Sequence, residues 1–568
     1  MDKRSLLAFV LAALVMMVPL LFRSGAKTPA SVKGQLPDTV KSAAAAASAP
    51  TQDTGAAAQP VAPRATGTLA VPTPAARGDT TATAFGNAQY VFSNVGATPA
   101  AVRLTAYANL RPGAPRDTKA TLATTTTAAL PLLRFRALIG GDTVRLDTIP
   151  FHAERAGDVV AFTSTGTPAV TLRYQFAGDG YLTHVTGQIA GAGSTSATGQ
   201  LLIDLPPTLR AQDADTLDDE RHLAYAYQAG QDDAKSISFS KLDPAFVRTD
   251  SGPMSWVAAR NKYFLIAVIA PNPASSFVAL RMQGGARVGK LAPTASATAI
   301  QPLRDGHFAF DVYAGPQSWK ELRALGHDLE NVNPYAGLIP GVQPFATICM
   351  RVLLWLKQTL NLSYGWVLII FGIAVRMLLW PLNQSAMRSS LKMQRLQPEL
   401  SEVQKKYKSD PEKQREALVK LYQQHGMSPF SPVMGCLPML LPMPVLFALY
   451  FVFQNTIEFR GVHFLWLPDL SLHDPYYIMP ILMGISMFVL SWIGMRAAPP
   501  NPQTKMMSYM MPVMMTVFLL NLASGLNLYY AVQNIAALPQ QWLLTRERMK
   551  AAPIAAPAPP LRGRRATT

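Results

Sequence analysis

Cysteine and charge are both scarce in this chain of 568 residues. Its two cysteines, Cys349 and Cys436, lie in apolar stretches and belong to neither a CxxC pair nor a Cys/His cluster. A disulfide framework and a structural zinc site are therefore not expected. Charged residues make up 15% of the chain, against about 25% in soluble proteins. This low fraction favours a protein that lies largely in lipid.

Familiar catalytic motifs are missing as well. The sequence contains no GxxxxGKS/T phosphate loop, no HExxH and no GxSxG elbow, and its eight histidines do not cluster. Each of these motifs holds reactive groups in a fixed geometry. We therefore predict no enzymatic activity, no cofactor and no metal ion.

The N-terminal region is predicted to direct the export of the segment after it. Residues 1–24 place Lys3 and Arg4 before an uncharged run from Leu6 to Phe22, which is typical of a transmembrane helix held with its start in the cytoplasm. A signal peptide cleaved near Ser24 is the alternative. Residues 25–84 are rich in alanine, proline and threonine, which predicts a disordered linker.

Residues 85–330 show the pattern of β-strands. Polar and apolar residues alternate in 89–93, 102–107 and 170–174, as expected for strands with one buried face. The apolar run 263–271 is too short to cross a bilayer and is predicted to be a buried strand. We therefore expect an exported antiparallel β-sandwich.

Five further apolar segments, at about 364–382, 437–456, 476–492, 506–520 and 525–544, predict a five-helix core within residues 362–545. The loop 383–431 holds nine lysines and arginines, whereas 457–475 holds only Arg460. Since positive loops stay in the cytoplasm, both termini are expected inside and the β domain outside. The predicted fold class is a multi-domain membrane protein with six transmembrane helices, one N-terminal and five in the core, and an exported antiparallel β-sandwich.

Arg376 is the most informative single residue, because it lies inside the apolar run 369–379. An arginine at mid-membrane costs about 2.5–3.5 kcal/mol on insertion scales. It therefore faces a water-filled cavity, or its long side chain extends to the inner headgroups. The sequence places no acidic residue deep in any predicted span.

The last span carries a matching polar stripe at spacings of three, four and seven residues: Asn527, Tyr530, Asn534 and Gln541. At 100° per residue these side chains lie on one face. Because asparagine and glutamine are costly in lipid, this face is predicted to meet protein or water, as Arg376 is. The alternative is that the stripe makes hydrogen bonds between helices.

Methionine is frequent in the predicted spans and is suited to surfaces that accept many partners. The alternative is that these side chains simply face lipid. The residues expected to form such an apolar surface are Met439, Leu440, Met443, Met507, Met510, Met511 and Met514.

Three amphipathic or basic segments flank the spans. Residues 342–361 predict a helix lying in the outer interface, with packing against the β domain as the alternative. Residues 384–426 predict a cytoplasmic hairpin of two helices, the first opening at Pro398, with the apolar residues Leu400, Tyr407, Leu418 and Tyr422. The basic tail, 546–568, is expected to contact anionic lipid or ribosomal RNA rather than DNA.

The hydrophobic half of the chain resembles the YidC family of membrane protein insertases. The resemblance covers about 342–544 and is carried by GCLPMLLPMP at 435–444, ALY at 448–450, DPYYIMPILMG at 474–484 and SGLNLYY at 524–530. The layout is similar to the Gram-negative form, which implies an inner-membrane protein whose antiparallel β-sandwich is periplasmic. Within the β domain, residues 255–264 carry the resemblance best.

The resemblance implies a water-filled groove that is open to the cytoplasm and to lipid. In it, Arg376 corresponds to the groove arginine, and Tyr530 and its neighbours correspond to groove and slide contacts with clients. The resemblance thus implies that the polar face of the last span lines a substrate groove with Arg376, and that the methionine-rich surface forms a hydrophobic slide for clients. It also implies a functional hairpin, nascent membrane proteins as clients and the Sec translocon as a partner. An anion-binding secondary transporter and a periplasmic scaffold anchored by the core are the rival functions.

Overall fold

The computed structural model describes residues 80–115, 117–124, 131–190, 199–230, 232–333, 342–407, 410–425, 443–496 and 502–550. The predicted first span, most of the predicted linker, Cys436, Met439, Leu440 and the tail beyond residue 550 lie outside these ranges.

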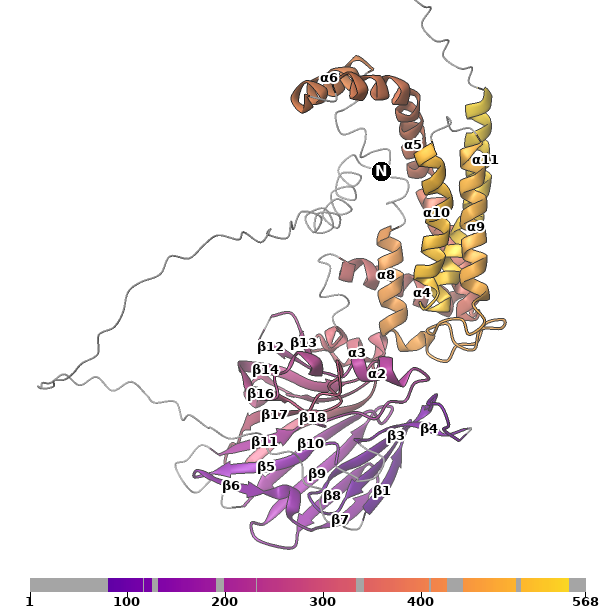
Figure 1. Ribbon diagram of the computed structural model, residues 1–568. Coiled ribbons are helices and arrows are strands. Elements are labelled where there is room, and N and C mark those ends of the chain that lie inside the picture. The colour runs from indigo at the N-terminus through magenta and orange to yellow at the C-terminus, as the bar shows by residue number, and fades with distance from the viewer. Residues whose placement is uncertain are drawn as a thin grey trace, which may run out of the picture. The chain divides into compact units, whose positions relative to one another are not determined.

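The N-terminal part of the described chain consists of two β-sheets. A four-stranded sheet has the order β1-β2-β3-β4. A larger sheet has the order β6-β5-β11-β17-β16-β14-β15-β18-β10-β9-β8-β7, and β12 joins it between β13 and β14 (Figure 1). Their bounds are β1 Thr80–Phe85, β2 Ala88–Ser93, β3 Thr98–Ala108, β4 Lys119–Leu122, β5 Arg134–Ile139, β6 Asp142–Arg145, β7 Phe151–Ala156, β8 Val159–Ser164, β9 Val170–Ala177, β10 Leu182–Ile189, β11 Gln200–Asp204, β12 Ala224–Ala229, β13 Lys235–Ser238, β14 Arg248–Arg260, β15 Phe264–Ile269, β16 Phe277–Gly284, β17 Ala295–Pro302 and β18 His307–Pro316.

The two sheets pack face to face through alternating aromatic side chains. Phe92 of β2 lies with its ring centroid 4.8 Å from Tyr174 of β9 and 5.4 Å from Phe162 of β8. The Tyr174 hydroxyl donates a hydrogen bond to the carbonyl of Ala97, 2.6 Å away. Neighbouring strands pair antiparallel, as in β1–β2 and β9–β10. The predicted antiparallel β-sandwich and its period-two strands are confirmed.

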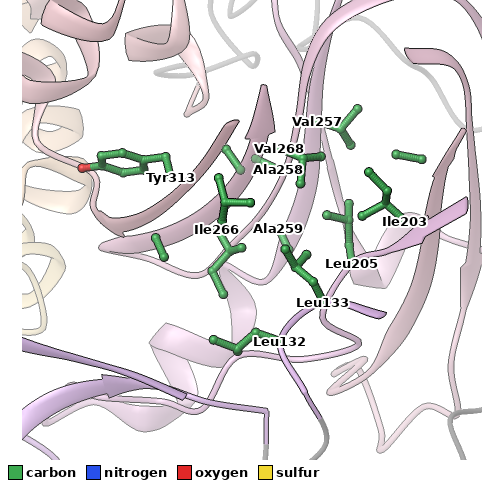
Figure 2. Packing of buried hydrophobic residues seen from close by; sticks show 14 of the residues in the cluster. Leu132, Leu133, Ile203, Leu205, Val257, Ala258, Ala259, Ile266, Val268 and Tyr313 are labelled. Atoms are coloured by element: carbon green, nitrogen blue, oxygen red, sulfur yellow. The ribbon is translucent and has the colours of Figure 1, made fainter. Parts of the chain in front are cut away.

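The apolar run predicted as a buried strand is β15, and each of its six residues is buried. It pairs with β14 and β18 inside the large sheet. Figure 2 shows Ile266 and Val268 of β15 among Val257, Ala258 and Ala259 of β14. A strand with neighbours on both sides and both faces covered loses the polar–apolar alternation.

Short helices complete this part: α2 Thr216–Arg221 and α3 Trp319–Leu325. Asp219 of α2 is buried, and its carboxylate accepts hydrogen bonds from the backbone N–H groups of Gln212 and Lys262 at 2.9 and 3.1 Å. Asn261 donates a third, at 3.3 Å. Together these bonds tie α2 to the turn between β14 and β15.

The C-terminal part is helical. Its longer helices are α4 Val342–Leu360, α5 Tyr364–Lys406, α6 Pro411–Gln424, α8 Met443–Asn455, α9 Ile478–Met495, α10 Pro502–Leu519 and α11 Ser524–Lys550. Among the described residues, the segments 364–384 and 478–495 are helical, long and apolar enough to cross a membrane. The count of six spans remains a prediction.

Helix α5 continues through Pro398, where a new helix was expected to open. The prediction of a helix start was therefore wrong. The apolar side chains of Leu396 and Leu400 lie one turn apart on either side of this proline and pack together against Tyr422 of α6. Their shared packing keeps the segment helical although proline lacks an N–H donor.

Candidate functional site: the polar face between α5 and α11

Arg376 of α5 is half-buried and reaches α11. Its Nη2 donates a hydrogen bond to Oε1 of Gln540, 2.9 Å away. The amide of Gln540 in turn donates to the carbonyl of Trp380 on α5, at 3.1 Å. The Nε of Arg376 is buried and has no hydrogen-bond partner within the described part of the chain. A buried N–H of this kind is unusual in proteins and offers a free donor to a polar group or to water.

A second amide of α11 bonds to α5 further along the same face. Gln533 donates to the carbonyl of Gly372 at 2.8 Å and to the hydroxyl of Tyr529 at 3.1 Å. Both Gln533 and Tyr529 are buried. Tyr529, Gln533 and Gln540 therefore form the side of α11 that faces α5.

The residues of the predicted stripe make different contacts. Asn534 donates to Ser486 of α9 at 3.1 Å, and the amide of Gln541 lies against Gly494 of the same helix. Asn527 is buried and donates to the carbonyl of Leu519 on α10, at 3.1 Å. The ring of Tyr530 packs edge-on against Tyr529, with centroids 6.0 Å apart. The structure thus brings Gln540, rather than Gln541, to Arg376.

The predicted hydrophobic slide lies partly within the described residues. Met510 and Met514 of α10 are exposed, together with Val513, Val517 and Phe518. Met511 is half-buried. The side chains of Met443 and Met507, like all of Met439 and Leu440, are not among those that the structure describes. One face of α10 therefore presents apolar side chains outward.

The hairpin is held by a small apolar cluster. Leu396 and Leu400 of α5 pack with Tyr422 of α6, and Leu418 and Leu421 lie against them. Tyr407 follows the last residue of α5 as its C-cap, and the Nζ of Lys406 lies over its ring, 5.5 Å from the centroid. Asp410 caps α6 by accepting the N–H of Lys413, as its Asp-Pro sequence predicts.

Helix α4 has two apolar faces. Ala346, Met350 and Leu353 are buried in the helical cluster, where α4 packs against α8. Ile348 and Trp355 are exposed on another side of α4. Exposed apolar side chains of this kind suit the outer interface of a membrane.

Comparison with known proteins agrees with this division of the chain. Residues 92–347 match the family model described as "YidC periplasmic domain", and residues 355–552 match "60Kd inner membrane protein". The fold and the matches define an inner-membrane protein with a periplasmic β-sandwich and a helical core.

The relatives carry one name, "Membrane protein insertase YidC". That of Chlorobium phaeovibrioides is 34% identical over 414 residues, which cover 68% of this chain and 69% of the relative. That of Chlorobaculum parvum is 31% identical over 434 residues, covering 72% and 70%. The chain therefore belongs to the YidC family of membrane protein insertases.

Other matches are shorter or more distant. The Chlorobaculum tepidum relative is 32% identical over 400 residues, and the match spans 65% of its length. A solved structure titled "Active YidC insertase crystal structure with the first transmembrane domain resolved" is 19% identical, with 83% of this chain and 94% of that chain covered and a TM-score of 0.33.

Proposed function

We propose that this protein inserts other proteins into the inner membrane through the polar face between α5 and α11. The observation that carries the proposal is Arg376, a half-buried cation in an apolar helix that keeps one buried donor without a partner in the described chain. An arginine whose role was an ion pair or a purely structural hydrogen bond would be expected to use this donor. In the described chain the Nε of Arg376 is left over for a client or for water.

The physical task of an insertase is to lower the cost of moving a polar segment into the bilayer. Stripping a polar group of water without replacement costs roughly 2–7 kcal/mol. In the proposed mechanism, a short polar segment of the client exchanges bulk water for Arg376 and its bound water. The client's apolar segment meanwhile moves along the predicted slide, including Met510, Met511 and Met514, into lipid. Hydrophobic partitioning then drives release without nucleotide.

The groove assignment extends to α11. Gln533 and Gln540 support it through their bonds to α5. Tyr530, the predicted client contact, is half-buried next to Tyr529. Asn527, Asn534 and Gln541 belong to the neighbouring face and are proposed to line the groove only where α9 and α10 move away from α11.

Orientation and partners complete the proposal. Both termini and the hairpin lie in the cytoplasm, as the distribution of lysine and arginine predicts. The hairpin and the basic tail receive the nascent chain or the ribosome. The Sec translocon is a further partner, as the family resemblance implies, and anionic lipids contact the basic segments.

Insertion by the purified protein tests the proposal. A single-span client with a short translocated tail is added to liposomes that contain only this chain, and protease protection of the tail is compared with empty liposomes. Protection above the empty control is expected without nucleotide. No gain over empty liposomes contradicts autonomous insertion, and substrate-dependent anion flux would then support the transporter.

A further inference from the structure

A basic cavity lies in the β-sandwich, beside β3 and β4. Its volume is about 470 Å³, and four of its lining residues are cations: Arg103, Arg111, Lys119 and Arg210. No aspartate or glutamate is among the lining residues that the structure describes. A cavity that gathers one sign of charge concentrates ions of the opposite sign.

The register of the small sheet explains how these charges meet. Arg103 of β3 pairs with Thr121 of β4, so their side chains share one face. Lys119 lies two residues before Thr121 on the same strand. The residues on the other face, Val102 and Leu104, are fully buried in the sandwich. Ordinary strand alternation therefore accounts for the outward position of Arg103 and Lys119.

A fixed segment closes the cavity along the free edge of β4. Gln212 is buried and bonds to Thr121 twice, accepting from its N–H at 3.2 Å and donating to its carbonyl at 2.9 Å. The N–H of Arg210 donates to the carbonyl of Ala123 at 2.9 Å. The N–H of Leu110 donates to the carbonyl of Gln212, also at 2.9 Å. These bonds fix the backbone of β4 and of the segment that carries Arg210 beside the cavity.

Arg210 departs from an ordinary surface arginine. Its side chain is half-buried, and its Nε is buried without a hydrogen-bond partner in the described residues. Buried polar atoms are paired in the great majority of cases, so an unpaired donor beside three further cations indicates an acceptor that binds there. An anion would satisfy this donor and reduce the mutual repulsion of the four charges.

We propose that this cavity binds a phosphate group, carried either by a phospholipid headgroup or by free phosphate. A phosphate presents three or more acceptor oxygens and matches the paired donors of guanidinium groups. A carboxylate presents only two oxygens to the four cations. The cavity volume leaves room for a glycerol unit next to the phosphate.

Titration of the full-length protein in a neutral maltoside detergent tests this site. Inorganic phosphate is one probe and glycerophosphoglycerol is the other, each followed by calorimetry. The variant R103Q/K119Q removes two exposed charges and is expected to weaken binding at least 10-fold. R210Q is expected to weaken it by a similar factor. The control R173Q/K241Q removes one arginine and one lysine that are exposed elsewhere on the β-sandwich, and should stay within twofold of wild type.

The outcomes separate the sources of the phosphate. Tighter binding of glycerophosphoglycerol than of inorganic phosphate assigns the site to a lipid headgroup, and the reverse order assigns it to free phosphate. Equal weakening by R103Q/K119Q and by R173Q/K241Q would overturn the proposal, as would the absence of saturable binding of both probes. If R210Q fails to fold, the R103Q/K119Q variant still tests whether the cavity binds phosphate.

Discussion

The guanidinium of Arg376 and the amide of Gln540 form one polar unit across two helices, with 2.9 Å between Nη2 and Oε1. The neighbouring Gln541 lies against Gly494 of α9 instead. Two adjacent glutamines of α11 thus belong to different helix contacts, and this difference can be used to test which face serves clients.

Replacing Gln540 by leucine should impair insertion, whereas replacing Gln541 by leucine should not. A hydrogen bond to a charged group contributes about 1.5–3 kcal/mol, so Gln540→Leu is expected to slow client insertion about 10- to 100-fold by misplacing Arg376. Protease protection in the liposome assay measures the effect. Equal loss in both variants would contradict the assignment of the α5 face.

Arg376 itself is expected to require its charge. Arg376→Ala should abolish insertion of the short-tailed client, and Arg376→Lys should retain part of it, because lysine keeps a cation but not the forked donors. The initial rate of tail protection is the measurement. If alanine supports insertion as well as arginine does, the charge has no part in the mechanism.

The hydrogen bond between Asn534 and Ser486 is expected to contribute stability. Interhelical hydrogen bonds in membranes average about 0.6 kcal/mol, so Asn534→Ala should lower the unfolding free energy in detergent by about that amount. Ser486 also donates to the carbonyl of Met483, so Ser486→Ala is measured alone as well, and the double variant should lose less stability than the sum of the two single variants. Full additivity of the two substitutions would show that the bond contributes nothing.

Gly484 allows α9 and α10 to approach closely. A Cβ there would lie 2.1 Å from Oγ1 of Thr516, which is held by its own hydrogen bond to Pro512. Gly484→Ala is therefore expected to separate the helices and to cost about 1–3 kcal/mol, as overpacking typically does. The exposed neighbour Ile485→Ala is the control in thermal unfolding. Equal melting temperatures would contradict the close contact.

Asp219 should make the β-sandwich less stable as pH rises. Burial raises the pKa of its carboxyl from 3.8 to about 7, and the charge of Asp213 adds to the effect. The folded state therefore holds a proton that the unfolded chain releases, and the stability this confers is complete below about pH 4 and is lost as pH rises through 7.

Thermal unfolding between pH 4 and 8 measures this dependence. Burial also raises the pKa of Glu458 to about 7, so ionisation of this residue lowers the stability further as pH rises. Asp219→Asn should reduce the slope and Glu458→Gln should reduce it further, although Asp219→Asn also loses an acceptor for the N–H groups around it. An unchanged slope in the double variant would exclude both carboxyls as its source.

The strands were predictable from sequence because burial on one face leaves a period of two. Which face of α11 meets α5 was not predictable, and the residues of α11 show why. Gln533 and Asn534 are adjacent, as are Gln540 and Gln541. Two polar stripes therefore run about 100° apart along one helix, with the same spacing. Only the positions of α5 and α9 determine which stripe meets Arg376.

The length of α5 could not be predicted from the sequence either. A proline is commonly found where helices begin, and Pro398 stands before a run with its own apolar spacing. The deciding factor is the contact of Leu396 and Leu400 with Tyr422, which lies on a separate helix. Contacts between segments far apart in sequence are not encoded in a local pattern.

The ends of the large sheet have a consequence for a protein proposed to handle unfolded chains. An unpaired strand edge can recruit any extended peptide, including a client. Here the free edges are β6 and β13, each only four residues long, and β7, whose sequence FHAERA carries Glu154 and Arg155 outward. Short or charged edges resist strand addition. The exported domain is thereby protected against co-aggregation with the hydrophobic segments that the membrane core attracts.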